Sequence, residues 1–172
     1  AMTASEALRL SLACSGLPIV LEQPCNTMEE INSIRSQISH PIYLDENTES
    51  PTDVLRAIAL GVCDGFGLKI TRLGGLNAFA TVRDICAMRS MPHTCEDTWG
   101  GDITAAAILH AAVTVTPRLL EAVWIPDNYI EEHYDPINGI QVISGQVELP
   151  KGDGLGITPD ESQFGSPVFS FS

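Results

Sequence analysis

Three charged residues stand at the ends of short apolar runs, where they could act together. Glu22 follows Ile-Val-Leu, Asp45 follows Ile-Tyr-Leu, and Lys69 follows Gly-Phe-Gly-Leu before the glycine pair at residues 74–75. Apolar residues on both sides of a position predict a strand that is buried on both faces, as in a parallel sheet. A lysine inside such a strand needs charged partners or a chemical task.

Together these residues are suited to removing a proton next to a carboxylate. The carboxyl ends of parallel strands converge on one site, so we expect Glu22, Asp45 and Lys69 to face a shared space. Two carboxylates without a nearby histidine or thiolate favour Mg²⁺ over Zn²⁺. A neighbouring cation lowers the pKa of a lysine, which can then act as a base while the metal stabilises the enolate charge.

A repeated alternation of helix starts and strands positions these residues. Capping boxes at residues 3–6 and 27–30 and a Ser-Pro pair at residues 50–51 predict three helix starts. Two further helices are expected after the glycine pairs at residues 74–75 and 100–101. Intervals of 23, 24, 28 and 27 residues separate the strand-end markers Glu22, Asp45, Lys69, Asp97 and Trp124.

This period predicts an α/β fold, in which helical crossovers connect a parallel sheet that is either open and doubly wound or closed as a barrel. We assign residues 1–126 to the sheet unit and residues 127–172 to a tail. Ser144-Gly145 between two apolar runs predicts a hairpin that packs outside the sheet. An open flavodoxin-like sheet, with phosphorylation or metal sites at its strand ends, is the alternative fold.

The ordered motifs resemble strands four to eight and the tail of the mandelate racemase and muconate lactonizing branch of the enolase superfamily. The resemblance covers nearly the whole chain. The motifs are Leu-Glu-Gln-Pro at 21–24, Leu-Asp-Glu at 44–46, Lys-x-x-Arg-x-Gly-Gly at 69–75, Glu-Asp-Thr-Trp-Gly-Gly-Asp at 96–102 and Gly-Leu-Gly at 154–156. The resemblance implies the C-terminal part of a modified (β/α) TIM barrel with Mg²⁺ as cofactor. Glu22 and Asp45 would be the second and third metal ligands, and Lys69 the acid/base of the sixth strand.

The resemblance also implies parts that these 172 residues lack. They are an N-terminal capping domain, the first strands with the first metal acid, and a second base that usually lies in a Lys-x-Lys motif. We expect the N-terminal remainder as a second fragment, because a half-barrel alone would expose two apolar sheet edges. A non-catalytic half-barrel that serves as a binding module is the alternative. We also expect a homo-oligomer.

Within this branch, the motifs at residues 22–27, 92–102 and 121–124 are similar to enzymes that act on proline derivatives. Hydroxyproline betaine 2-epimerases are the nearest match, and cis-3-hydroxy-L-proline dehydratases are near relatives. The expected activity is that of a racemase or epimerase, an isomerase that removes and returns the Cα proton of a proline-type betaine through an ene-diolate. An aromatic face recognises a permanent cation. We therefore predict that Trp124 binds the substrate, with Glu96 or Asp97 as the opposing charge.

Three further polar residues are expected around the site. Arg72 is predicted to neutralise acids at the barrel mouth, and Glu46 to stand beside the metal ligands. His93 is predicted to lie near the substrate carboxylate, with a hydrogen-bonded histidine of the core as the alternative. The alternative activity is that of a dehydratase, a lyase that forms the same enolate but expels a β-hydroxyl group. The identity of the product separates these two activities.

The composition indicates which partners are improbable and which cellular compartment is expected. A formal charge of −13 would repel phosphate groups, so we expect neither nucleic acid nor an acidic membrane surface as a partner. Five cysteines without a Cys-x-x-Cys pair are typical of a reducing cytoplasm. The expected partner is a small molecule, namely a proline-derived betaine or amino acid.

Overall fold

The computed structural model describes residues 1–170, and within them five strands form one parallel sheet. The strands pair in the order of the chain. This order has no reversal point, whereas a doubly wound sheet requires one, so the flavodoxin-like alternative is wrong. The strands are β1 (Leu21–Glu22), β2 (Ile42–Leu44), β3 (Gly65–Lys69), β4 (His93–Glu96) and β5 (Leu120–Trp124).

Helices connect successive strands. The starts predicted at residues 3–6, 27–30, 50–51 and 74–75 are confirmed, whereas the last helix begins inside the glycine pair at residues 100–101 rather than after it. The hydroxyl groups of Thr3, Thr27 and Ser50 each accept a hydrogen bond from a backbone N–H in the first helical turn. The short helix α4 follows β3 directly and was not predicted; it ends at Gly74, whose φ of 91° favours glycine. The α-helices are α1 (Ala4–Ala13), α2 (Met28–Ile34), α3 (Pro51–Leu60), α4 (Ile70–Leu73), α5 (Leu76–Arg89) and α6 (Gly101–Ala112). The 3₁₀-helices are η1 (Arg35–Gln37), η2 (Asp127–Tyr129) and η3 (Glu161–Phe164).

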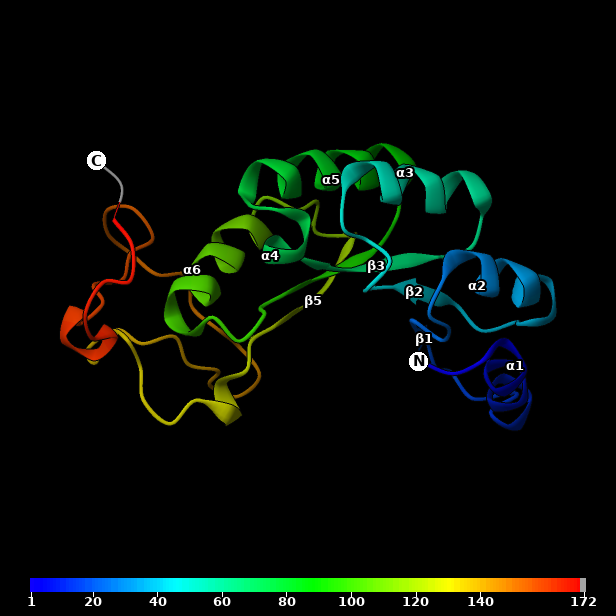
Figure 1. Cartoon of the computed structure of the whole chain (residues 1–172), viewed down its shortest axis with the longest axis horizontal. Coiled ribbons are helices and arrows are strands. Elements are labelled where there is room, and N and C mark those ends of the chain that lie inside the picture. The colour runs from blue at the N-terminus through cyan, green and yellow to red at the C-terminus, as the bar shows by residue number, and fades with distance from the viewer. Residues whose placement is uncertain (171–172) are drawn as a thin grey trace.

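Strand alternation sends apolar and functional side chains to opposite faces of the sheet. One face packs against the helices, where Figure 1 shows α3 and α5 together on one side of the sheet. Its buried side chains include Leu21, Ile42, Leu44, Phe66, Leu68 and Cys95. The other face is the inner face. It carries Glu22, Tyr43, Asp45, Gly65, Gly67, Lys69, Thr94 and Glu96.

The tail packs against α6 through an apolar cluster and a buried carboxylate. The cluster joins Ile140 to Ala105, Ala106 and Leu109 of α6. Asp102, which is 1% exposed, accepts hydrogen bonds from His133 Nδ1 at 2.8 Å, the Asp135 amide at 3.2 Å and the Ile140 amide at 2.8 Å. Ile140, which was predicted to lie in a hairpin, thus packs against a helix. The division of the chain at residue 126 stays a prediction.

The hairpin prediction is correct for the turn and wrong for the strands. Ser144 and Gly145 have φ of 53° and 75°, as a tight turn requires. Ile143 and Gln146 flank the turn and exchange two backbone hydrogen bonds, at 2.8 and 3.0 Å. No ladder continues beyond this bridge in the part of the chain that the structure describes. An isolated two-stranded ribbon is marginally stable. Four apolar side chains of the tail pack in the cluster with α6 instead, namely Ile140, Val147, Leu155 and Ile157.

Candidate metal and proton-transfer site

Three carboxylates meet on the inner face at the carboxyl ends of β1, β2 and β4. Glu22 ends β1, Asp45 directly follows β2 and Glu96 ends β4. Each offers an oxygen atom that lies within 4.8 Å of the others. The structure thus brings together the two predicted metal ligands and adds Glu96, which was predicted only to bind substrate.

Lys69 lies between two of these carboxylates at the end of β3. Its Nζ donates hydrogen bonds to Asp45 Oδ1 at 2.7 Å and to Glu96 Oε2 at 2.6 Å. The side chains of Lys69, Asp45 and Glu96 are 13%, 8% and 16% exposed. Arg72, in α4, forms a second ion pair with Asp45. Two cations therefore offset the charge of the acids, as a partly buried acidic cluster requires.

Burial and neighbouring charges shift two pKa values in this cluster. Burial alone would lower the pKa of Lys69, but hydrogen bonds and charges from Asp45 and Glu96 outweigh it and raise that pKa. This direction is opposite to the one expected beside a cation, because carboxylates are the nearest charged groups. The pKa of Glu22 is also raised, first by burial and then by the charges of Glu96 and Asp45.

Gly67 leaves the space in which the acids meet. It lies two residues before Lys69 on the same face of β3, and a Cβ atom there would lie 2.9 Å from Glu96 Oε1. The same atom would lie 3.6 Å from Glu22 Oε1. An all-oxygen donor set with a small open space among its members fits a hard divalent cation such as Mg²⁺.

A second group of polar side chains lies further down the inner face. The Tyr43 ring covers Gly65, where a Cβ atom would come within 2.3 Å of the ring. Burial, followed by a hydrogen bond with Glu121, raises the pKa of the Tyr43 hydroxyl. Tyr43 and Glu121 line a cavity of about 220 Å³ together with Glu22, Gly67, Thr94, Glu96 and Val20. The acid cluster therefore opens onto a small cavity rather than a closed core.

Three aromatic rings lie together at the carboxyl end of β5. Trp124 ends β5 beside Glu96 in the strand register and is 39% exposed. The Trp99 ring lies 5.4 Å from that of Trp124 and 5.1 Å from that of Tyr129, both edge to face. Neither Trp99 nor Tyr129 was among the predicted site residues. Nothing in the local sequence of Tyr129 indicates that η2 folds back over the end of β5.

The remaining predicted site residues lie apart from Lys69. Asp97 is buried, and its carboxylate accepts hydrogen bonds from the Thr98 and Gly100 amides at 2.5 and 3.4 Å. His93 is buried as well, with Nδ1 3.2 Å from the Met91 carbonyl oxygen. Glu46 is exposed and lines a hollow that also includes Glu22. Substrate contact by Asp97 and supporting roles for His93 and Glu46 stay predictions.

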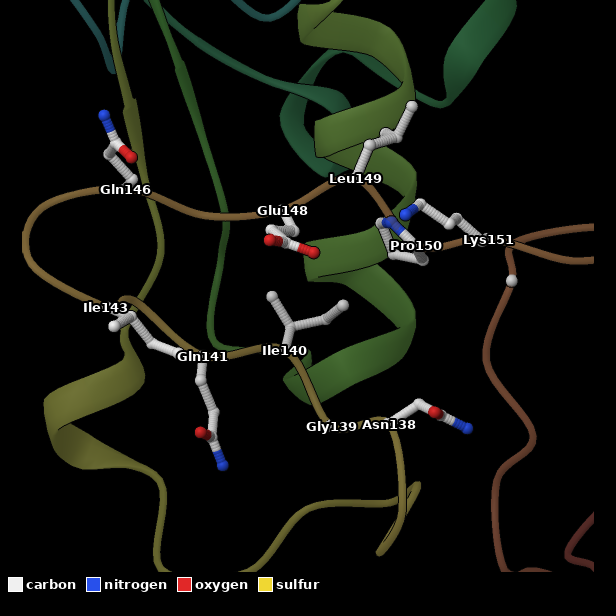
Figure 2. Close-up of a pocket in the computed structure, with 11 residues that line it drawn as sticks. Asn138, Gly139, Ile140, Gln141, Ile143, Gln146, Glu148, Leu149, Pro150 and Lys151 are labelled. Carbon is white, nitrogen blue, oxygen red and sulfur yellow. The ribbon is translucent and has the colours of Figure 1, made fainter.

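A larger hollow lies in the tail, away from the acid cluster. It measures about 460 Å³, and Figure 2 shows it between two stretches of the tail, residues 138–143 and 146–151, beside a helix. Glu148 and Lys151 are its charged lining residues. This lining offers no group of carboxylates around a base, so we place the candidate site at Lys69.

Comparison with known proteins agrees with this geometry. A family model described as "Enolase C-terminal domain-like" matches residues 1–163. A cis-3-hydroxy-L-proline dehydratase of Roseibium aggregatum is 38% identical over 171 residues, which are 99% of this chain and 46% of that protein. An o-succinylbenzoate synthase of Geobacillus kaustophilus is 31% identical over 170 residues, 95% of this chain and 44% of that protein. The chain thus spans about half the length of these curated relatives.

Solved structures show the same similarity. A mandelate racemase/muconate lactonizing enzyme from Roseovarius nubinhibens ISM superposes with a TM-score of 0.89 at 33% identity, covering 98% of this chain and 45% of that one. A member of the enolase superfamily from the same organism, complexed with magnesium, gives 0.93 at 28% identity, with coverages of 99% and 46%. Sequence, fold and site lead to one conclusion: the chain belongs to the Enolase C-terminal domain-like family of the enolase superfamily.

Proposed function

We propose that this chain forms part of a Mg²⁺-dependent enzyme that removes the Cα proton of a hydroxyproline-type acid. The observation that carries the proposal is the position of Lys69 among Glu22, Asp45 and Glu96 on one sheet face. A lysine that reaches into a cluster of acidic metal ligands is suited to proton transfer next to a carboxylate. Similarity to enolase-superfamily enzymes supports this reaction class.

The residues of this chain have separate roles in the proposed reaction. Glu22, Asp45 and Glu96 would hold Mg²⁺, which when bound supplies positive charge opposite the substrate carboxylate. With the charge of these carboxylates offset by the cation, the pKa of Lys69 would fall, and its amine would take the proton from Cα on one face of the substrate. Arg72 stays paired with Asp45 and holds that carboxylate in place. The relatives are about twice as long as this chain, and we propose that the first metal acid and a second base come from an N-terminal remainder of the enzyme.

We propose dehydration as the first outcome to test. Lys69 removes the Cα proton, the β-hydroxyl group leaves with a proton as water, and a double bond forms between Cα and Cβ. The resulting enamine then tautomerises to a cyclic ketimine. Water is the only other product, and the reaction needs no oxidant or reductant. The relative from Roseibium aggregatum, which is a cis-3-hydroxy-L-proline dehydratase, supports this outcome.

Epimerisation of a proline-type betaine is the second candidate. Here the proton returns to the opposite face of Cα, and no group leaves. The three rings of Trp99, Trp124 and Tyr129 favour this candidate, because exposed aromatic faces attract a quaternary ammonium group by about 0.5 to 2 kcal/mol. The sequence motifs had favoured the epimerase, whereas the curated relative with 38% identity is a dehydratase.

Proton NMR in deuterium oxide with Mg²⁺ tests both candidates. The protein as purified, with its intact mass recorded to show what accompanies the chain, is given cis-3-hydroxy-L-proline, proline betaine and hydroxyproline betaine. A ketimine product indicates the dehydratase, and loss of the Cα proton signal with a new diastereomer indicates the epimerase. No exchange with any substrate in a sample that contains the full enzyme would contradict the proposal.

The two lysines of the chain provide a matched pair of variants. Lys69→Ala is expected to reduce Cα exchange by about 10² to 10⁴-fold, because the proton acceptor is lost. Lys151→Ala removes an exposed lysine of the tail and should leave the rate unchanged. Equal rates for the two variants would show that Lys69 is not the base.

A further inference from the structure

The side-chain amide of Gln23 connects the ends of two strands that carry candidate metal ligands. Its Oε1 accepts hydrogen bonds from the backbone amides of Asp45 at 3.1 Å and Asn47 at 3.3 Å. Its Nε2 donates to Asn47 Oδ1 at 2.7 Å and to the Cys25 carbonyl oxygen at 2.8 Å. One side chain at the end of β1 thus holds the backbone at Asp45, just beyond β2.

The hydrogen-bond partners fix the orientation of this amide. Two backbone N–H groups converge on one atom, which must be the oxygen, and a carbonyl oxygen faces the other, which must be the nitrogen. Asn47 extends the network, because its Nδ2 donates to the Asn26 carbonyl oxygen at 2.9 Å. Every donor and acceptor of the Gln23 amide is therefore used within the loops that follow β1 and β2.

The backbone of Gln23 has an unusual conformation. Its φ is 38°, in the left-handed region that residues other than glycine seldom occupy. Such a conformation persists where surrounding contacts compensate for it, and it is frequent at functional sites. The backbone N–H of Gln23 also donates a hydrogen bond to the Tyr43 carbonyl oxygen at 2.8 Å, which continues the pairing of β1 with β2. The turned backbone places Glu22 before the bend, while the Gln23 side chain lies against the loop of Asp45.

We infer that Gln23 is a positioning residue that fixes Asp45 relative to Glu22, so that both carboxylates bind one divalent cation. This inference rests on the metal site of the proposed function. Gln23 itself does not touch the cation or the substrate; it acts through the backbone of Asp45. The side-chain oxygen of Gln23 is the atom that matters, because it receives the Asp45 amide.

Three variants separate this role from general stability. Gln23→Met keeps the length of the side chain and removes all its hydrogen bonds. Gln23→Glu keeps an oxygen acceptor for the two backbone amides. Gln37→Met makes the same change as the first variant at an exposed glutamine of η1, before β2. Mn²⁺ serves as the probe, with binding measured by electron paramagnetic resonance, and hydrogen exchange reports on the Asp45 and Asn47 amides.

We expect Gln23→Met to weaken Mn²⁺ binding at least tenfold and to speed exchange of the Asp45 amide at least tenfold. Gln23→Glu keeps the acceptor for the Asp45 amide but loses the two bonds that Nε2 donates, so it should protect that amide better than Gln23→Met and weaken Mn²⁺ binding less. Gln37→Met should match the parent in both measurements. Unchanged binding and exchange in Gln23→Met would overturn the inference, and so would equal impairment of the Met and Glu variants.

The two measurements also distinguish this inference from the proposed function. If the parent protein binds no Mn²⁺, the metal site of the proposed function fails. Exchange then decides the role of Gln23 alone: faster exchange of the Asp45 amide in Gln23→Met supports the positioning of Asp45, and unchanged exchange overturns it.

Discussion

The acid cluster depends on a residue that has no side chain. Gly67 and Lys69 lie on the same face of β3, and the space above Gly67 is where Glu22 and Glu96 approach. Any side chain at Gly67 would displace a carboxylate oxygen rather than a flexible apolar group. Glycine thus shapes the metal site in the same strand that supplies the lysine.

Gly67→Ala is therefore expected to weaken Mn²⁺ binding about tenfold, which corresponds to about 1.4 kcal/mol. The added methyl group would lie 2.9 Å from Glu96 Oε1. Gly65→Ala is the matched control on the same strand face, because its methyl group would meet the Tyr43 ring instead. That control should lower the free energy of unfolding by about 1 to 3 kcal/mol through overpacking. Metal titration and urea unfolding of both variants check the expectation, and equal Mn²⁺ affinities would contradict it.

At the level of elements, two buried aspartates hold the tail against the barrel. Asp102 in α6 accepts hydrogen bonds from three groups of the tail. Asp135 then organises the tail itself, since it accepts from the amides of Ile137 at 2.9 Å, Asn138 at 2.8 Å and Thr158 at 2.8 Å. The tail has little regular secondary structure, so these two carboxylates accept hydrogen bonds from backbone amides that a neighbouring strand would otherwise accept.

The tail should therefore loosen in acid. Hydrogen bonds from the amides of Thr158 and Asn138 lower the pKa of Asp135 to about 2, from an ordinary value of 3.8. A lowered pKa in the folded state contributes stability above the unfolded value, and that contribution is lost as the pH falls from about 4 to about 2. Hydrogen exchange of the Thr158 amide should accelerate across this interval beyond the intrinsic pH effect. Asp135→Asn should remove this pH dependence, and an unchanged profile in that variant would contradict the explanation.

At the level of the whole molecule, the sheet has one covered and one open face. Within residues 1–170, β1 and β5 each pair with a single neighbour, and the inner face carries most of the charged site. No helix among these residues is long and apolar enough to span a membrane. Homo-oligomer formation, the cytoplasmic location and the non-catalytic half-barrel alternative stay open to experiment.

The covered face predicts how the five cysteines react. Burial raises the pKa of the Cys63, Cys86 and Cys95 thiols to about 12, and it also raises that of Cys25. Cys14 alone is partly exposed. Because thiolates are the reactive form, we expect one thiol per native chain to react rapidly with Ellman's reagent, and all five after unfolding. Rapid reaction of three or more native thiols would show that the helical face of the sheet is not closed.

The sequence alone was sufficient for features that depend on near neighbours along the chain. Capping residues satisfy amides three positions away, and apolar runs define strands, so the helix starts and the parallel sheet followed from local patterns. Glu22, Asp45 and Lys69 were predicted together because each ends a strand. Resemblance to the enolase superfamily added the barrel topology, which the spacing of the strands had left open.

Only the tertiary structure decided which side chains meet. Glu96 and Asp97 are adjacent in sequence, yet the strand register places Glu96 beside Lys69. The Asp97 carboxylate instead accepts a hydrogen bond from a backbone amide of the following loop. The raised pKa of Lys69 likewise depends on its contacts with Asp45 and Glu96, which lie 24 and 27 positions away in the sequence. The rings of Trp99 and Tyr129 meet although 30 positions separate them in the sequence. Local pattern determines the elements, but register and loop packing join segments far apart in the chain, and no short stretch of sequence contains both sides of such a contact.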